Sequence, residues 1–304
     1  MNLLTQTLHP DNLRRAWEDV AENGGIPGVD NITIRRWRRS WEERLVELAR
    51  AVRANQYKPT KLRRRRIPKK TPGQYRTLRI PTITDRVLQR AVLQQLYPIF
   101  EPKFLPCSCG YRPGRSLKDA VRAITHWRKQ GHVWVLDADI DDFFNQVNHT
   151  LLHQFLQEDL PDQSLMPLIN QWLKIGRSHP DKPVGIPMGS PLSPLLANVY
   201  LHRLDEALTG DGYILIRYAD DFILLNRSRQ QAEQSHKRTA EILNTLHLQL
   251  EPAKTRITSF DEGFDFIGVH FEETLYWYNW QNKRIEIHDD NTDWLFNNFG
   301  PDYT

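Results

Sequence analysis

The sequence predicts an α+β fold in which a split βαβ arrangement lies on an antiparallel sheet. The first observation is a short apolar strand, Val133–Asp139, that ends in acidic residues. The second is an apolar hairpin, Tyr213–Leu225, with the adjacent acids Asp220 and Asp221 as its turn. Helical segments lie between strand and hairpin, and a helix and a strand follow, which is the element order of a split βαβ unit.

Capping residues and helix breakers mark the other elements. Ser116 and Asp119 have the spacing of a capping box, and Lys129 and Gly131 are typical of the end of the helix that they begin. A helix is predicted from Thr84 and Asp85 to Phe100, with Val87, Ala91, Val92, Leu96 and Ile99 on its buried side. Another helix begins at Ser193, with Pro194 in its first turn, and ends at about Leu208. The remaining predicted elements are two helices within residues 11–55 around the turn Gly24–Asp30, helices over Asn148–Ile175, a helix from about Ser228 to Leu246, a strand at Leu248–Leu250 and a hairpin over Thr274–Ile287.

Length and composition exclude several classes of protein. The chain has 304 residues and a formal net charge of +4, enough for a sizeable core. Its apolar stretches are too short to span a membrane, and its polar, Arg-rich start does not have the order of a signal peptide. We therefore expect a cytoplasmic protein without a membrane partner. The two cysteines, Cys107 and Cys109, are too few for a disulfide framework, and reduced thiols in a structural turn are expected.

The net charge conceals a strong asymmetry along the chain. Residues 1–130 contain 28 Lys and Arg against 11 Asp and Glu, whereas the rest contains 13 against 26. A basic first half predicts a bound polyanion, and an acidic second half predicts bound metal ions. The run Lys61–Arg66 is dense enough to favour phosphate contacts over the alternative, an ordinary solvated surface.

Adjacent carboxylates at the end of buried strands repel each other, and a divalent cation removes that cost. If the strand that ends at Asp139 neighbours the hairpin, this residue joins Asp220 and Asp221 around one metal cluster. Two metal ions held by carboxylates can activate a hydroxyl and stabilise a leaving pyrophosphate, which is nucleotidyl transfer. The alternative is that the two aspartates only fill a turn. On composition alone, the competitors of Asp139 are Asp137, Asp141 and Asp142.

The segment Tyr218–Asp221 resembles the active-site box of reverse transcriptases. The resemblance extends from about Asn12 to about Phe271 and is closest to the bacterial group II intron type. Seven boxes besides this one, in the correct order, are far more specific than any one of them. The matching segments are Ala16–Asp30 (N-terminal extension), Ile67–Lys69, Arg79–Val87 and Phe104–Ser116 (fingers), Gly185–Asn198 (palm loop and helix), and Leu250–Thr255 and Phe264–Gly268 (last two boxes).

This resemblance implies right-hand polymerase fingers and palm, with a ferredoxin-like split βαβ palm. The implied organisation is an N-terminal extension and basic fingers with part of the palm helices over 1–130, a palm over 131–271, and a short C-terminal hairpin and tail over 272–304. The residues after Phe271 are too few for a three-helix thumb, so the thumb is expected to be short or absent. The implied activity is RNA-directed DNA synthesis with Mg²⁺, or alternatively Mn²⁺, on an RNA template, a DNA or RNA primer and dNTPs.

The resemblance assigns Asp139, Asp220 and Asp221 as catalytic metal ligands and adds the backbone carbonyl of Ile140. In the family the first ligand lies five residues before an aromatic residue, and the spacing of Asp139 and Phe144 fits. Such a ring would lie against the sugar of the incoming nucleotide and exclude a 2′-hydroxyl.

Other nucleotide contacts are implied less directly. One of the neighbouring residues Phe143 and Phe144 is expected to be an ordinary core residue and not a nucleotide contact. Lys69, with Lys70 as its alternative, and Arg76 would face the triphosphate, because cations there neutralise developing charge.

Met188 stands where the family usually has Gln, so it keeps the volume beside the nascent base pair and loses the polar contact. Lys254 resembles the family lysine near the primer end, with a surface lysine as the alternative. Nucleic-acid contacts are expected from six arginines: Arg63, Arg64, Arg65, Arg66, Arg112 and Arg115.

The segment after the palm is similar to that of CRISPR-associated reverse transcriptases, which work with the adaptation integrase. It contains Phe271 and Glu272, the aromatic run Tyr276–Trp280 and the basic run Lys283–Ile285. This implies cDNA synthesis for spacer acquisition in antiviral defence. The alternatives are an intron-derived or defence-associated enzyme outside CRISPR, and a non-catalytic nucleic-acid-binding scaffold with the polymerase fold.

Overall fold

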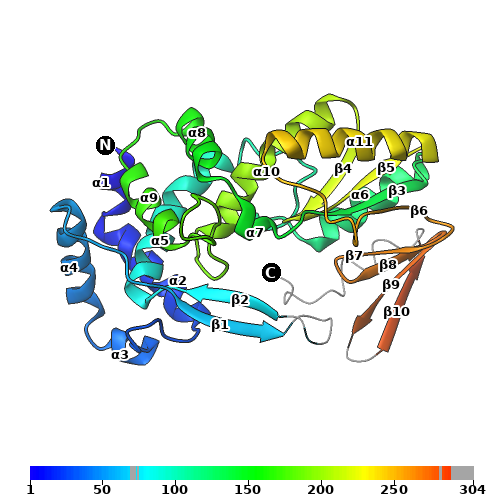
Figure 1. Cartoon of the computed structure of the whole chain (residues 1–304). Helices are drawn as coiled ribbons and strands as arrows, with labels where there is room; N and C mark the ends of the chain where they lie inside the picture. The colour runs from blue at the N-terminus through cyan, green and yellow to red at the C-terminus, as the bar shows by residue number, and fades with distance from the viewer. Residues whose placement is uncertain (69–72, 74, 281–282, 289–304) are drawn as a thin grey trace. The chain divides into compact units, whose positions relative to one another are not determined.

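The chain forms two compact units, each built from two separate segments. The computed structural model describes residues 1–68, 73, 75–280 and 283–288 (Figure 1). Unit 1 combines residues 1–103 with 144–199, and unit 2 combines residues 104–143 with 200–304. Two helices, α7 (Phe143–Gln146) and α10 (Ser193–Gly210), begin in one unit and end in the other. Helices and antiparallel strands occur together, so the predicted α+β class is confirmed.

The central helix of unit 1 is α5 (Ile83–Phe100). It begins after Thr82, whose side chain accepts a hydrogen bond from the Asp85 backbone N–H, two residues before the predicted start. The predicted buried positions at 87, 91, 92 and 96 are fully buried, and position 99 is half-buried. The other elements of unit 1 are α1 (Leu3–Thr7), α2 (Pro10–Asn23), α3 (Ile34–Arg38), α4 (Trp41–Arg53), β1 (Arg63–Pro68), β2 (Tyr75–Ile80), α8 (His149–Asp159) and α9 (Met166–Ile175).

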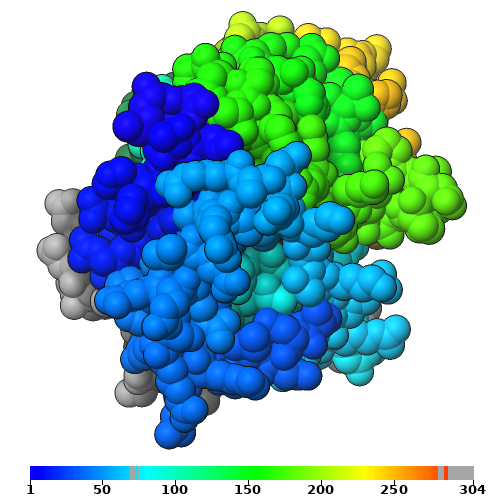
Figure 2. All heavy atoms as spheres, turned by 90° about the vertical axis from the view of Figure 1, so that its left-hand side faces the viewer, coloured from blue at the N-terminus to red at the C-terminus, as the bar shows by residue number. Residues whose placement is uncertain are grey.

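The N-terminal helices pack on α5 and on the later segment of unit 1. Buried Asn12 on α2 donates to the Ala91 carbonyl at 3.0 Å, and the Trp17 and Trp37 rings lie 4.3 Å apart between centroids. The Leu3 backbone N–H donates to an Asp162 carboxylate oxygen at 2.9 Å. Figure 2 shows the blue N-terminal helices beside the green segments of α8 and α9 on this face of unit 1.

Unit 2 contains the predicted sheet. Its strands are β3 (Trp134–Asp139), β4 (Ile214–Tyr218), β5 (Asp221–Asn226) and β6 (Arg256–Ser259), in the antiparallel order β4-β5-β3-β6. This is the strand order of a ferredoxin-like βαββαβ unit. The predicted strand at Leu248–Leu250 is wrong, because β6 pairs with β3 instead and Leu250 forms only an isolated bridge with Ile140.

Two helices of unit 2 pack on this sheet: α6 (Leu117–Lys129) and α11 (Arg229–Thr245). The capping box at Ser116 and Asp119 is present, as predicted. On the α6 side, apolar residues of β3, β4 and β5 share one core with Ala120, Val121 and Ile124.

A second sheet of unit 2 completes that core. Its order is β10-β9-β8-β7, with β7 (Phe264–Phe266), β8 (Val269–Glu272), β9 (Leu275–Trp280) and β10 (Lys283–His288). The β9–β10 pair confirms the predicted C-terminal hairpin, which joins the strands before it in one sheet. The rings of Phe264 and Phe271 stack at 5.1 Å within the shared core. No helix in the described part of the chain is long and apolar enough to cross a bilayer.

Candidate active site

Asp139 and Asp221 lie directly opposite each other at the ends of two paired strands of unit 2. Residues opposed in an antiparallel pair project from the same face of the sheet. The β4–β5 hairpin closes on the pair Tyr218 and Asp221, so its two turn residues are Ala219 and Asp220. The sequence placed the turn one residue later, at Asp220 and Asp221. Ala219 adopts the left-handed conformation, with φ of 61°.

Burial and neighbouring charges raise the pKa values of two aspartates at this strand end. Burial, together with the charges of Asp220 and Asp139, raises the pKa of Asp221 to about 7. The pKa of Asp220 is also raised, first by burial and then by Asp139. Ionising all three carboxylates together is therefore costly unless a cation lies among them.

Lys254 supplies one positive charge. Its ammonium donates to a carboxylate oxygen of Asp139, and this hydrogen bond raises the pKa of Lys254. The backbone positions the pair, because Glu251 N–H donates to the Asp139 carbonyl at 2.8 Å and Lys254 N–H to the Glu251 carbonyl at 3.1 Å. Lys254, which resembles the family lysine, thus lies against the first predicted ligand.

The structure also separates Asp139 from its competitors. Asp137 is opposite Arg256 on β6, and their side chains pair at 3.3 Å. Asp141 and Asp142 follow the end of β3 in a turn. Of these four acids, only Asp139 occupies the register position opposite the aspartate of β5.

The donor chemistry fits a divalent cation such as Mg²⁺ or Mn²⁺. Within the described ranges, no group of three or more His, Cys, Asp or Glu residues is arranged as it stands to hold a metal ion, and the Lys254 ammonium lies on one of the carboxylates. Three clustered carboxylates with two raised pKa values nevertheless form the oxygen-rich, electron-rich set that such ions prefer. Asp139, Asp220 and Asp221 are the residues that would hold it. Buried Ile140 follows directly in the chain, and its carbonyl ligand stays a prediction.

Unit 1 contains a basic hairpin in which β1 pairs with β2. Arg64, Arg65 and Arg66 are exposed, and no ion pair to an acid involves them among the described residues. Arg63 is half-buried and donates to the Pro27 carbonyl at 3.3 Å. Three of the four predicted arginines are therefore available to phosphate groups, whereas Arg63 also fixes the base of the hairpin.

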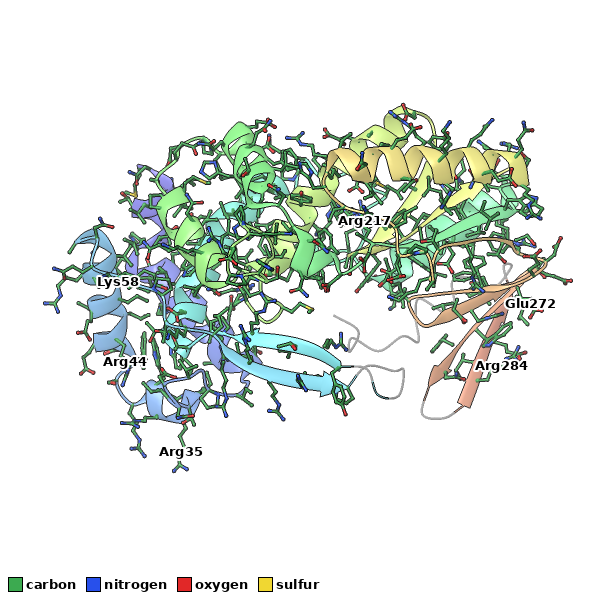
Figure 3. The ribbon with its side chains drawn as sticks, in the orientation of Figure 1. Arg35, Arg44, Lys58, Arg217, Glu272 and Arg284 are labelled. Carbon is green, nitrogen blue, oxygen red and sulfur yellow. The ribbon has the colours of Figure 1, made fainter. Side chains whose placement is uncertain are left out.

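Arg76 lies on β2, opposite Ile67, and is exposed. Alternation along β1 places Arg65 and Ile67 on one face, so Arg76 shares the face of Arg65. Lys69 and its alternative Lys70 lie outside the described residues. Elsewhere in unit 1, Arg35 on α3 extends away from its helix and adds to the exposed positive charge (Figure 3).

The loop that contains Met188 is bound to the base of this hairpin. Arg79 N–H donates to the Met188 carbonyl at 2.7 Å, and the Arg79 guanidinium donates to Gly176 O and Asn145 Oδ1 at 2.6 and 2.5 Å. Gly189 has φ of 109°, and a Cβ there would lie 3.2 Å from the Arg79 carbonyl oxygen. A glycine therefore allows the loop to adopt this conformation, in which the Met188 side chain is half-buried.

Phe143 and Phe144 differ as predicted in their exposure. Phe143 is 1% exposed and its ring lies 6.4 Å from that of Tyr200, whereas Phe144 is half-buried. Both belong to the short helix α7. The Phe144 carbonyl accepts from Ile186 N–H at 2.8 Å, so the backbone beside this ring is fixed to the loop before Met188.

Arg112 is only 8% exposed, and its guanidinium donates to Leu105 O and Ser108 O, each at 2.8 Å. This placement favours a role in holding the loop over the predicted contact with nucleic acid. Arg115 is half-buried, and its predicted contact remains untested. Cys109 in the same loop is a free thiol whose pKa burial raises to about 11, in accord with a structural role.

A buried pair that the sequence reading did not assign lies next to the aspartates. Arg217 on β4 and Asp205 on α10 are both fully buried, and Nε and Nη2 of Arg217 bind the two carboxylate oxygens at 2.7 and 2.5 Å. One signal could have found Arg217: it is a charge within an apolar strand, which requires a buried partner. Asp205 gives no such signal, because it reads as one polar position of a helix.

Comparison with known proteins agrees with this geometry. The family model described as reverse transcriptase (RNA-dependent DNA polymerase) matches residues 67–271, and the chain belongs to this family. It is 36% identical over 205 residues to the group II intron-encoded protein LtrA of Lactococcus lactis, a match covering 66% of this chain and 34% of LtrA. It is 29% identical over 316 residues to protein YkfC of Escherichia coli strain K12, covering 88% of this chain and 81% of YkfC.

Among solved structures, a partial Cas6-RT-Cas1–Cas2 complex matches 80% of this chain and 43% of its own chain, with 28% identity and a TM-score of 0.47. The chain thus spans about a third of the intron-encoded relative and less than half of the chain in that complex.

Proposed function

We propose that the chain is an RNA-directed DNA polymerase that adds deoxynucleotides to a primer 3′-hydroxyl on an RNA template. The observation that supports this most directly is the register pair Asp139 and Asp221, with Asp220 in the adjoining turn. The three carboxylates therefore lie at one end of the paired strands. The chain belongs to the reverse transcriptase family, which supports reading them as its catalytic carboxylates.

The three aspartates would hold Mg²⁺, or alternatively Mn²⁺, from the end of β3 and the β4–β5 turn. When bound, such ions favour deprotonation of the 3′-hydroxyl and stabilise the leaving pyrophosphate. Lys254 is protonated at neutral pH, as lysines ordinarily are, and its ammonium neutralises Asp139 in the absence of metal.

Residues of unit 1 would bind the nucleotide and the nucleic acid. Exposed Arg76, together with Lys69, would neutralise the triphosphate. Phe144 would lie against the sugar, and Met188 would take the position beside the nascent base pair. The exposed arginines Arg64–Arg66 would contact backbone phosphates of the template or primer.

Primer extension on an RNA template tests the proposal. Asp220→Ala or Asp139→Ala should reduce extension by orders of magnitude, while RNA binding, measured by fluorescence anisotropy, stays largely intact. Loss of an anion does not remove any attraction for a polyanion. Asp261→Asn is the matched control, because Asp261 is an exposed aspartate in the same unit. Wild-type extension by Asp220→Ala would show that the site assignment is wrong.

The pathway is a separate question. Supply of cDNA for CRISPR spacer acquisition, together with an adaptation integrase, rests on the resemblance of residues 271–285. Cells that contain the chain and such an integrase should acquire RNA-derived spacers with wild type and not with Asp220→Ala. Equal acquisition with both would favour the non-catalytic scaffold, and acquisition with neither would favour intron mobility or another defence role.

A further inference from the structure

The peptide that precedes Asp220 is bound to a buried guanidinium. Arg217 lies two residues before Ala219 on β4 and is fully buried. Its Nη1 donates to the Ala219 carbonyl at 2.9 Å. Because the peptide group is planar, the orientation of this carbonyl also fixes the N–H of Asp220. A hydrogen bond from a charged donor in a dry environment is short and directional, so it restricts this peptide strongly.

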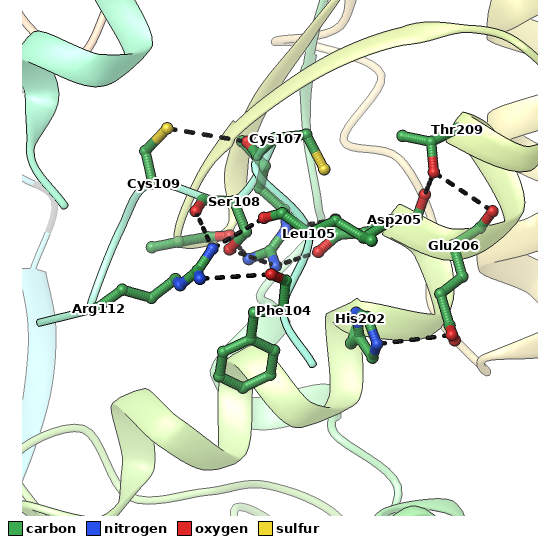
Figure 4. A network of polar contacts seen from close by, with 12 residues as sticks. Phe104, Leu105, Cys107, Ser108, Cys109, Arg112, His202, Asp205, Glu206 and Thr209 are labelled. Atoms are coloured by element: carbon green, nitrogen blue, oxygen red, sulfur yellow. Dashed lines mark hydrogen bonds and ion pairs between the residues drawn. The ribbon is translucent and has the colours of Figure 1, made fainter. Parts of the chain in front are cut away.

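The guanidinium is itself held from two other segments of unit 2. Asp205 on α10 accepts from Nε and Nη2 with both carboxylate oxygens, and Ser108 Oγ accepts from Nη2 at 2.8 Å. Figure 4 shows Asp205, Ser108 and Arg112 converging in this network. Burial alone would lower the pKa of Arg217, but Asp205 outweighs burial and raises it, so the donor remains charged.

The 104–112 loop binds the same strand end through its backbone. Arg217 N–H donates to the Cys107 carbonyl and Cys109 N–H donates to the Arg217 carbonyl, each at 2.8 Å. A Cβ at Gly110 would lie 2.4 Å from the Ala219 nitrogen, so only glycine allows this approach. Three elements thus fix Ala219 in its left-handed conformation: the 104–112 loop through Gly110, α10 through Asp205, and β4 through Arg217.

We propose that Arg217 is a positioning residue that orients Asp220 through the Ala219 carbonyl, with Asp205 and Ser108 fixing the guanidinium. This rests on the proposed function. A buried ion pair is weak evidence for stability, because apolar residues of similar volume often replace one without loss. The feature that apolar residues cannot reproduce is the directional bond to the Ala219 carbonyl.

An apolar replacement of the ion pair separates its effect on stability from its effect on the Ala219 carbonyl. The double variant Arg217→Met with Asp205→Leu removes both charges together and leaves neither unpaired. Its melting temperature should stay within a few degrees of wild type, while kcat for primer extension falls about tenfold to 100-fold, since a small misplacement at a reacting centre costs that much. The KM for dNTP should change little. Mn²⁺ affinity, measured by calorimetry, should also fall, and this readout does not require activity.

Two further variants keep the test decisive if the double variant does not fold. Ser108→Ala removes one acceptor, and Arg217→Lys keeps the charge without the planar fork that binds Asp205 and Ala219 together. Arg217→Lys should lower kcat and Mn²⁺ affinity more than Ser108→Ala at a temperature where both are folded. The control is Arg238→Met with Asp211→Leu, an exposed pair in the same unit that is also 2.7 Å long.

Normal kcat and normal Mn²⁺ affinity in a folded double variant, or in Arg217→Lys, would overturn the proposal and leave the pair a purely structural feature. If the wild-type chain itself does not extend primers, the proposed function fails instead. The Mn²⁺ titration then still decides whether Arg217 orients Asp220.

Discussion

The Lys254 ammonium and the Asp139 carboxylate form an ion pair at the end of β3, although 115 residues separate them in the sequence. A divalent cation that binds the same carboxylate competes with this ammonium for the negative charge of Asp139. The Lys254 side chain is 62% exposed, so the pair contributes about 0.2–1 kcal/mol. Lys254→Met should therefore raise Mn²⁺ affinity by up to about fivefold, as measured by calorimetry without nucleotide.

Asp139→Asn is the matched control, because it removes the negative charge that the cation needs and should lower Mn²⁺ affinity. Weaker Mn²⁺ binding by Lys254→Met would contradict the competition, and would indicate that the lysine helps to preform the site.

The exposed arginines of β1 give the second prediction. Replacement of Arg64, Arg65 and Arg66 by Ser should weaken RNA binding and reduce the slope of log K against log salt concentration by about two units, if each contacts one phosphate. The sequence reading included Arg63, but this residue donates to the Pro27 carbonyl and is left unchanged so that the hairpin base stays intact.

The control for this change removes three arginines that already have acidic partners in unit 2: exposed Arg229 and half-buried Arg203 and Arg238. It alters the net charge equally and should leave the slope nearly unchanged. Equal slopes in the β1 variant and the wild type would mean that the run is only a solvated surface.

His149 gives a prediction about pH. Its Nε2 donates to the Gly185 carbonyl at 2.7 Å, and burial, with a further contribution from Arg177, lowers its pKa. In the unfolded chain His149 has the ordinary histidine pKa of about 6.5, so its imidazole takes up a second ring proton more readily there than in the folded protein. Stability is therefore fully present above about pH 6.5 and falls as the pH drops toward the folded pKa.

His149→Gln keeps a donor for Gly185 but cannot titrate. The slope of the free energy of unfolding against pH, from denaturant titrations between about pH 5 and 7, should decrease by at most about 1.4 kcal/mol per pH unit. His132 and His202, whose pKa values burial also lowers, should preserve the rest of the slope. An identical slope in the variant would show that His149 is not protonated differently on unfolding.

Local signals in the sequence predicted most elements of this fold. The capping box at Ser116 and Asp119 and the apolar hairpin depend on neighbouring residues only, and both are present. The strand after α11 was misplaced because its partner is far away in sequence. Leu248–Leu250 is as apolar as a strand should be, yet the register of β3 is completed by Arg256–Ser259, where Arg256 meets Asp137.

In the candidate site, too, local patterns were predictable and contacts between distant residues were not. The aspartates were found from their spacing and from the resemblance, and the structure adds their register. The connection from Arg217 to Ser108 joins residues 109 positions apart, and neither has a local pattern that indicates the other. Arg112 was predicted to contact nucleic acid, and only the folded structure shows that its donors bind carbonyl groups of its own loop.

The last prediction concerns the choice of sugar by Phe144. A half-buried ring at this position can exclude a 2′-hydroxyl by a direct clash, which a single side chain can supply. Phe144→Ala should therefore raise the efficiency of ribonucleotide incorporation relative to deoxynucleotide, as the ratio of kcat/KM values. The loop contact should persist, because Ile186 N–H donates to the Phe144 backbone carbonyl and not to its side chain.

Phe143→Ala is the matched control, since it removes the same side chain one residue earlier. Phe143 is 1% exposed and packs near Tyr200, so its loss should cost about 3–5 kcal/mol of stability and leave the sugar ratio unchanged. Thermal melts of both variants accompany the kinetics. A change in sugar preference for Phe143→Ala, with only an early melt for Phe144→Ala, would shift the assignment by one residue. The five-residue spacing that selects Asp139 as the first metal ligand would then lose its basis.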